Sequence, residues 1–172
     1  MACFDHEEVG SATRSGACGP FLEDILVRIA EGMGITGASY RAMIARSSCV
    51  SSDAGHGVHP NYVEKFDPAN HPLLNEGSLL KINANQRYAT DGVGGALWQR
   101  ACTAAGVPTQ DFVSNNSVPC GSTIGPLTAT RLGMLTVDVG VPLMSMHSTR
   151  ELAGIADLAY LSKALGAYWA GA

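Results

Sequence analysis

The spacing of apolar residues along the chain predicts a series of helices. In the clearest case, apolar residues recur at helical intervals between positions 20 and 33. Pro20 suits a first helical turn, and Glu23 and Asp24 complement the positive charge of a helix N-terminus. The same periodicity predicts helices over residues 20–33, 37–44, 88–105, a segment ending near 132–133, and 149–167. In the last of these, we expect the inward-facing residues to be Leu152, Ile155, Leu158, Ala159 and Leu165.

Short apolar runs between these helices predict β-strands. The expected strands cover residues 47–52, 78–83, 111–114 and 134–139. Two stretches without periodicity, residues 55–77 and 118–125, are predicted to be loops. Strands that alternate with helices predict an α/β fold in three layers, with a mostly parallel sheet flanked by helices. The length of 172 residues suits one domain.

Composition and charge narrow the possible functions. A hydrophobic content of 46% with 15% charged residues is typical of a globular protein. The net charge of −4 provides no basic surface, so nucleic acid is not an expected partner. Membrane association is not expected either, since no apolar run approaches the roughly 20 residues that a membrane span needs. The five cysteines are scattered without a CxxC pair, which favours reduced, mostly buried thiols in a cytoplasmic protein.

Three short stretches carry residues that are suited to metal chemistry. Glu7 and Glu8 are adjacent near the start, while Asp53 and His147 each follow a predicted strand, where α/β folds place their sites. Carboxylate and imidazole donors suit zinc, and two zinc ions generate hydroxide near neutral pH. On an extended strand, Glu7 and Glu8 point to opposite faces, so one can bind metal while the other acts as general base. The alternative is a solvated acidic strand end.

Lys81 is the only charged residue in its predicted strand. A cation on an otherwise apolar strand needs a carboxylate partner if it is buried. Alternatively, its side chain extends along the strand edge and its ammonium reaches water.

Five segments, taken in order, resemble the aspartyl aminopeptidase family. They are Glu-Glu-Val-Gly-Ser at 7–11, Ser-Asp-Ala-Gly-His-Gly-Val-His-Pro-Asn-Tyr at 52–62, Lys-Ile-Asn-Ala-Asn-Gln-Arg-Tyr-Ala-Thr at 81–90, Pro-Cys-Gly-Ser-Thr-Ile-Gly-Pro at 119–126, and Met-His-Ser-Thr-Arg-Glu at 146–151. The resemblance runs nearly from Asp5 to the C-terminus. It implies a zinc exopeptidase, with two zinc ions per complete active site, that removes N-terminal residues from peptides, acidic ones in the namesake branch. It also implies assembly as a homo-oligomer, commonly a dodecamer.

The resemblance also implies a role for individual residues. Glu7 would be the general base that activates the attacking water. Glu8 and His147 would bind one zinc ion, and Asp53 would bind the other. The substrate contacts would be His59, which stabilises the tetrahedral intermediate, and Lys81, which pairs with an acidic substrate side chain.

The sequence departs from the family pattern in one respect. The family has two further ligands, a histidine and a bridging aspartate, and an inserted oligomerisation domain, all before the Glu-Glu motif at 7–8. We therefore expect residues 1–172 to be the C-terminal part of a catalytic domain, from a longer protein, and not to be active alone. The alternative is a truncated, inactive homologue that acts as a metal-free binding or assembly module.

Overall fold

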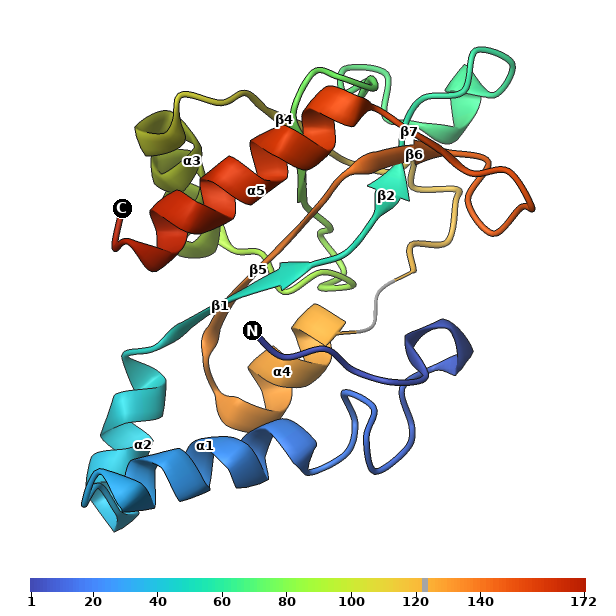
Figure 1. Cartoon of the computed structure of the whole chain (residues 1–172). Coiled ribbons are helices and arrows are strands. Elements are labelled where there is room, and N and C mark those ends of the chain that lie inside the picture. The colour runs from blue at the N-terminus through green and yellow to red at the C-terminus, as the bar shows by residue number, and fades with distance from the viewer. Residues whose placement is uncertain (122–123) are drawn as a thin grey trace. The chain divides into compact units, whose positions relative to one another are not determined.

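The computed structural model describes residues 1–121 and 124–172, and it divides into two compact units. The first unit comprises residues 1–49 and 121–136, and the second comprises residues 50–120 and 137–172. Figure 1 shows the helices and strands of both units, which we describe separately. No helix among the described residues is long and apolar enough to cross a membrane.

The first unit is built mainly from helices. These are α1 (Phe21–Gly32), α2 (Gly37–Ala45) and α4 (Ile124–Leu132). Helices α1 and α2 confirm the helices predicted at 20–33 and 37–44, and α4 ends where a helix was predicted to end, near residues 132–133. The loop predicted at 118–125 includes Ser122 and Thr123, which lie outside the described residues.

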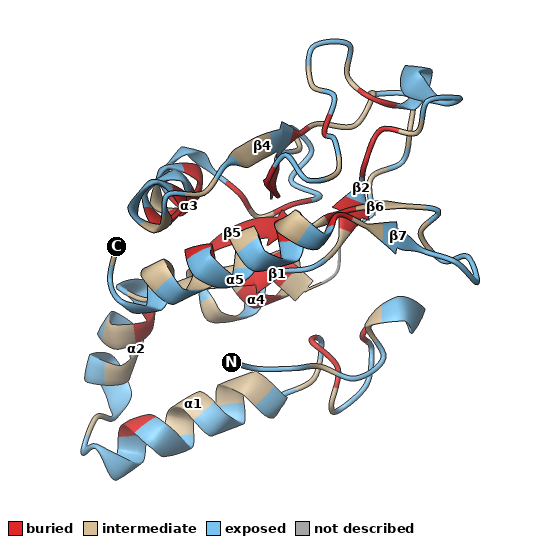
Figure 2. Cartoon of the chain, turned by 45° about the horizontal axis from the view of Figure 1, so that its top comes forward, coloured by how far each residue is buried: buried red, intermediate tan, exposed pale blue. Residues whose placement is uncertain are grey.

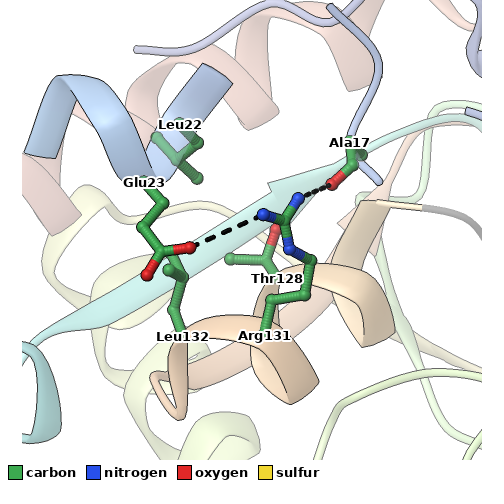
Figure 3. Close-up of a pocket in the computed structure, with 6 residues that line it drawn as sticks. All are labelled: Ala17, Leu22, Glu23, Thr128, Arg131 and Leu132. Carbon is green, nitrogen blue, oxygen red and sulfur yellow. Dashed lines mark hydrogen bonds and ion pairs between the residues drawn. The ribbon is translucent and has the colours of Figure 1, made fainter. Parts of the chain in front are cut away.

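Arg131 of α4 holds the turn that precedes α1 (Figure 3). Its Nη1 atom donates to the carbonyl oxygens of Ala17 at 3.3 Å and Cys18 at 2.6 Å, and it also contacts that of Gly19. Its Nη2 atom forms an ion pair with Glu23 at 3.5 Å. The small pocket around this side chain is lined by Ala17, Leu22, Glu23, Thr128, Arg131 and Leu132. Arg131 therefore has a structural role, fixing where α1 begins.

Helix α1 buries only part of its apolar face. Ala30 is fully buried, whereas Phe21, Ile25, Ile29 and Met33 remain exposed along the helix (Figure 2). These four residues are each separated by four positions, so they form one continuous stripe.

A four-stranded sheet has the order β1-β5-β3-β4, and most of it belongs to the second unit. Its strands are β1 (Ser48–Ser52), β5 (Leu135–Gly140), β3 (Ser78–Lys81) and β4 (Thr109–Phe112). Strand β3 pairs in parallel with β4 and antiparallel with β5. The α/β class is therefore confirmed, with a mixed sheet. Strand β4 begins two residues before the predicted start.

The second sheet is small and was not predicted. It has the order β2-β6-β7, with β2 (Gly55–His56), β6 (Pro142–Met144) and β7 (Leu152–Ala153). Strand β2 and the short 3-10 helix η2 (Val63–Lys65) interrupt the loop that was predicted at 55–77. This sheet joins the chain just after Asp53 to the chain just before His147.

Helices α3 (Gly92–Ala105) and α5 (Ile155–Trp169) pack against each other in the second unit. Between them and the sheet lies the main core, which is formed by Leu80, Trp98, Ala101, Cys102, Val137, Val139 and Ala164. Helix α3 begins four residues after the predicted position 88, because the Asp91 side chain caps it by accepting a hydrogen bond from Gly94 N at 2.7 Å.

The predicted start of the last helix was wrong. Helix α5 begins at Ile155, with Gly154 as its N-cap, because residues 152–153 pair with β6 instead. Leu152, Ile155, Leu158 and Ala159 are consequently exposed, contrary to the prediction, whereas Leu165 packs against the core.

The prediction of mostly buried thiols was also wrong. All five cysteines are free, but only Cys102 is buried, and both Cys3 and Cys18 are exposed.

Candidate functional site

The predicted site residues are divided between the two units. Glu7 and Glu8 belong to the first, whereas Asp53, His59, Lys81 and His147 belong to the second.

Glu7 and Glu8 do not end an extended strand, as was predicted, but lie in a short 3-10 helix, η1 (Glu7–Val9). His6 and Gly10 flank it with left-handed backbones, at φ of 61° and 98°, and Gly10 N donates to the Glu7 carbonyl at 3.1 Å. Successive residues of a 3-10 helix point about 120° apart. The two carboxylates therefore still point in different directions, and Glu7 is partly buried while Glu8 is exposed.

Asp53 and Lys81 are brought together in the second unit. Lys81 Nζ donates to Asp53 Oδ2 at 3.0 Å and to the Ala54 carbonyl at 2.6 Å. The other carboxylate oxygen, Asp53 Oδ1, accepts from Ala54 N at 2.7 Å. The Lys81 side chain is only 3% exposed, so the alternative in which its ammonium reaches water is wrong. The chain itself supplies the carboxylate partner that a buried lysine needs.

Two glycines make room for the Lys81 side chain. A Cβ atom at Gly55 would lie 3.3 Å from Lys81 Cε, and one at Gly140 would lie 3.2 Å from it. A Cβ atom at Gly140 would also collide with the Asp53 carbonyl. Glycine at these two positions therefore leaves room for the Lys81 stem, which a Cβ atom at either position would crowd.

The ring of Tyr88 packs beside the Lys81 ammonium. The sequence did not identify Tyr88 as a site residue. Its ring centroid lies 5.5 Å from Lys81 Nζ, within the range of a cation–π contact. Burial raises the pKa of Tyr88, and a hydrogen bond with the Cys120 side chain raises it further. Tyr88 therefore stays neutral.

Asp138 is a second residue that the sequence analysis missed. It lies on β5 and is only 3% exposed. Leu80 pairs with Val139, and one further step in this antiparallel register places Asp138 opposite Lys81. Burial raises the pKa of Asp138, while hydrogen bonds from the Ser51 side chain and Ala89 N, and the charge of Lys81, oppose that rise. A single charged residue in an otherwise apolar strand is the signal that identified Lys81, and the same signal would have identified Asp138.

His147 follows β6 and lies near His56. Its backbone has a left-handed φ of 64°, and its N–H donates to Glu151 Oε1 at 2.6 Å. Burial lowers the pKa of His56, and the nearby His147 and Lys81 lower it further. His56 therefore lies in the same electrostatic environment as two of the predicted site residues.

His59 is held by its own loop. Its Nδ1 atom accepts a hydrogen bond from Asn61 N at 3.1 Å, and its ring lies 5.2 Å from that of Tyr62 in a tilted contact. Nδ1 is thus an acceptor, so a proton on the neutral ring resides on Nε2. In this tautomer, Nε2 can donate a hydrogen bond to a ligand.

The comparisons with known proteins bear on the whole chain. Residues 1–169 match the family described as Aminopeptidase I zinc metalloprotease (M18). The chain belongs to this family. It is 52% identical over 168 residues to a probable M18 family aminopeptidase 2 of Streptomyces coelicolor, covering 98% of this chain and 39% of that protein. A protein of the same description from Pseudomonas aeruginosa is 49% identical over 170 residues, covering 99% of this chain and 39% of that protein.

Solved M18 structures agree with the fold. The structure described as the Ape4 and Nbr1 complex matches with a TM-score of 0.93 and 43% identity, over 96% of this chain and 31% of that one. Yeast aminopeptidase 1 matches with a TM-score of 0.86 and 32% identity, over 97% of this chain and 37% of that one. The chain thus spans well under half of the length of these M18 relatives.

The zinc that the M18 family implies requires more donors than these residues bring together. The predicted ligands are Glu8, Asp53 and His147, but no three His, Cys, Asp or Glu residues in the described part of the chain are placed to hold a metal ion. Both Asp53 oxygens already accept hydrogen bonds from within the chain. A catalytic zinc normally has three protein ligands. The described residues therefore do not fit a complete zinc site by themselves.

We accordingly expect the 172-residue chain to bind zinc weakly. After dialysis against zinc-free buffer, elemental analysis should find fewer than two equivalents per chain, because no site supplies three donors. Two equivalents that survive dialysis would contradict this expectation.

Proposed function

We propose that this chain supplies part of the active centre of an M18 metalloaminopeptidase, which removes N-terminal residues from peptides. The observation that carries this proposal is the match to the M18 family over residues 1–169. Because the chain spans 39% of the curated relatives, the activity is proposed for a protein in which donors from outside these residues complete the metal site.

Within that centre, Glu7 is proposed to accept a proton from the attacking water. Glu7 is partly buried whereas Glu8 is exposed, and this difference supports separate roles for the two carboxylates. Glu8, Asp53 and His147 are proposed as donors to the two zinc ions of the complete site.

Lys81 is proposed to select substrates with an acidic N-terminal residue. In this structure its ammonium already binds a carboxylate, that of Asp53, so its surroundings fit such a group. The Asp53 side chain is 43% exposed, which leaves the pair open to an incoming ligand. His59, with a proton on Nε2, is proposed to donate to the tetrahedral intermediate.

A homo-oligomer is proposed for the active protein. One solved relative, which is 32% identical over 98% of this chain, is described as the S. cerevisiae mApe1 dodecamer. The alternative function, a metal-free binding or assembly module, predicts that neither zinc nor a chelator changes the thermal stability of the chain.

The substrate preference is tested by replacing Lys81 with methionine. The assay protein is a chimera in which these 172 residues replace the matching segment of the Streptomyces coelicolor relative. For an aspartyl substrate, Lys81→Met should lower kcat/KM about 100-fold, because the substrate carboxylate loses its ion-pair partner. Hydrolysis of a leucyl substrate should change far less.

The matched control is Lys163→Met, which removes an exposed lysine from α5 and should leave both substrates unaffected. Equal losses for aspartyl and leucyl substrates in Lys81→Met would show that Lys81 acts through Asp53 and does not select the substrate.

A further inference from the structure

We infer that Asp138 is a positioning residue, whose carboxylate holds Tyr88 against the ammonium of Lys81. The inference rests on the proposed function in one respect, namely that Lys81 binds the acidic side chain of the substrate. The contacts that carry it lie within the second unit.

The first observation is that Asp138 ties strand β5 to residues 88–90. Its Oδ2 atom accepts a hydrogen bond from Ala89 N at 2.6 Å. Its own backbone N–H donates to Thr90 Oγ1 at 2.9 Å. Since Asp138 is 3% exposed and Thr90 is 7% exposed, water cannot readily replace either contact. One residue of a central strand therefore holds two consecutive residues of a loop.

The second observation is that this loop carries Tyr88. The segment lies between β3 and the start of α3, and it has no helix or strand pairing of its own. The Tyr88 ring contacts Lys81 Nζ at 5.5 Å and meets the Phe112 ring edge-on at 6.1 Å. Loss of the Asp138–Ala89 bond would loosen the residue next to Tyr88. The Tyr88 ring would then lose its fixed position next to Lys81 Nζ.

The third observation concerns charge. Asp53 and Asp138 both act on Lys81, but they differ in accessibility. Asp53 makes the direct ion pair and is 43% exposed, so a ligand carboxylate can compete with it. Asp138 is buried, opposite Lys81 in the sheet, and its carboxylate is already held by Ser51 and Ala89. Its contacts with Ser51 and Ala89 are thus independent of which group is the direct partner of Lys81.

The test compares Asp138→Ala with Asp138→Asn in the 172-residue chain. In the wild type, the Tyr88 ring should shift the NMR signals of the Lys81 ε-methylene upfield from those of exposed lysines. Alanine removes the acceptor for Ala89 N–H, so this shift should largely disappear. Asparagine keeps an acceptor oxygen, so most of the shift should remain. Asp111→Ala, an exposed aspartate on β4, is the matched control and should leave the shift unchanged.

Two results would overturn the inference. If Asp138→Ala keeps the shift, the hydrogen bond to Ala89 does not position Tyr88. If the upfield shift is lost in Asp138→Asn as fully as in Asp138→Ala, then the charge of Asp138, and not its hydrogen bond to Ala89, positions Tyr88. Should Asp138→Ala fail to fold, hydrogen exchange of the Ala89 amide in the wild type and in Asp138→Asn decides: exchange should be slow in both, and fast exchange in the wild type would overturn the inference, because the carboxylate would not hold that N–H.

Activity separates this inference from the proposed function. In the chimera, Asp138→Ala should lower the ratio of aspartyl to leucyl kcat/KM about tenfold, with asparagine restoring it. If Lys81→Met leaves that ratio unchanged, the proposed role of Lys81 fails, whatever Asp138 does. If Lys81→Met lowers the ratio and Asp138→Ala leaves it unchanged, the positioning role fails alone.

Discussion

Replacing Asp157 with alanine is expected to destabilise the chain by about 3–5 kcal/mol. This aspartate in the first turn of α5 is fully buried and accepts hydrogen bonds from Asn75 N at 2.6 Å and Gly77 N at 2.8 Å. Hydrogen bonds to a charged acceptor contribute about 1.5–3 kcal/mol each, and alanine leaves both donors without a partner. Urea denaturation, followed by tryptophan fluorescence, measures the loss.

The control is Asp91→Ala, which removes a single N-cap hydrogen bond from α3 and should cost about 1 kcal/mol. Asp157→Asn keeps one acceptor oxygen and should fall between the two. If Asp157→Ala costs no more than Asp91→Ala, then the bonds to Asn75 and Gly77 do not hold the loop.

The reason to expect a large effect is the position of that loop, directly before β3. Asn75 is also bound through its Oδ1 atom by Ala156 N at 3.1 Å, and Gln110 Nε2 donates to the Gly77 carbonyl at 2.9 Å. Gly77 has a φ of 115°, and a Cβ atom there would collide with the Pro108 carbonyl. The buried Asp157 thus fixes where β3 begins, three residues before Lys81.

The sequence predicted those elements whose cause is local. Helix α1 follows from apolar spacing and acidic residues in its first turn, and β1 follows from a short run between turns. The start of α5 does not follow from local pattern. Leu152 fits a helical period but pairs with β6, and the partners of Asp157 are 80 and 82 residues away in the chain. Such long-range pairings leave no periodic signal.

The site residues show the same limit, because contacts that depend on long-range pairing could not be predicted from the sequence. A buried lysine predicted a carboxylate partner, and Asp53 is that partner. Tyr88 and Asp138 were missed because their roles depend on which strands are neighbours, and the antiparallel β3–β5 pairing was not predicted. The expected strand at Glu7 was wrong because His6 and Gly10 adopt left-handed backbones that close a turn around it.

Replacing Glu7 with glutamine in the chimera is expected to lower kcat by about 10³-fold or more without loss of zinc. Glutamine has nearly the shape of glutamate but cannot accept the proton of the attacking water, and general-base catalysis contributes about 10²–10⁴-fold. Glu8→Gln should instead remove zinc, because a neutral amide is a much weaker ligand than a carboxylate. Both kcat and metal content are measured for each variant.

The pair of variants works because the two glutamates are adjacent in one turn yet differ in exposure. Any general disturbance of η1 should affect zinc content and turnover alike in both variants, whereas divided roles separate the two measurements. Loss of zinc in Glu7→Gln, with zinc retained in Glu8→Gln, would mean that their roles are exchanged. Glu31→Gln, an exposed glutamate on α1, should change neither quantity. An unchanged kcat in Glu7→Gln would mean that another residue is the base. The decisive comparison is therefore the kcat of Glu7→Gln against that of the unsubstituted chimera when both hold the same amount of zinc.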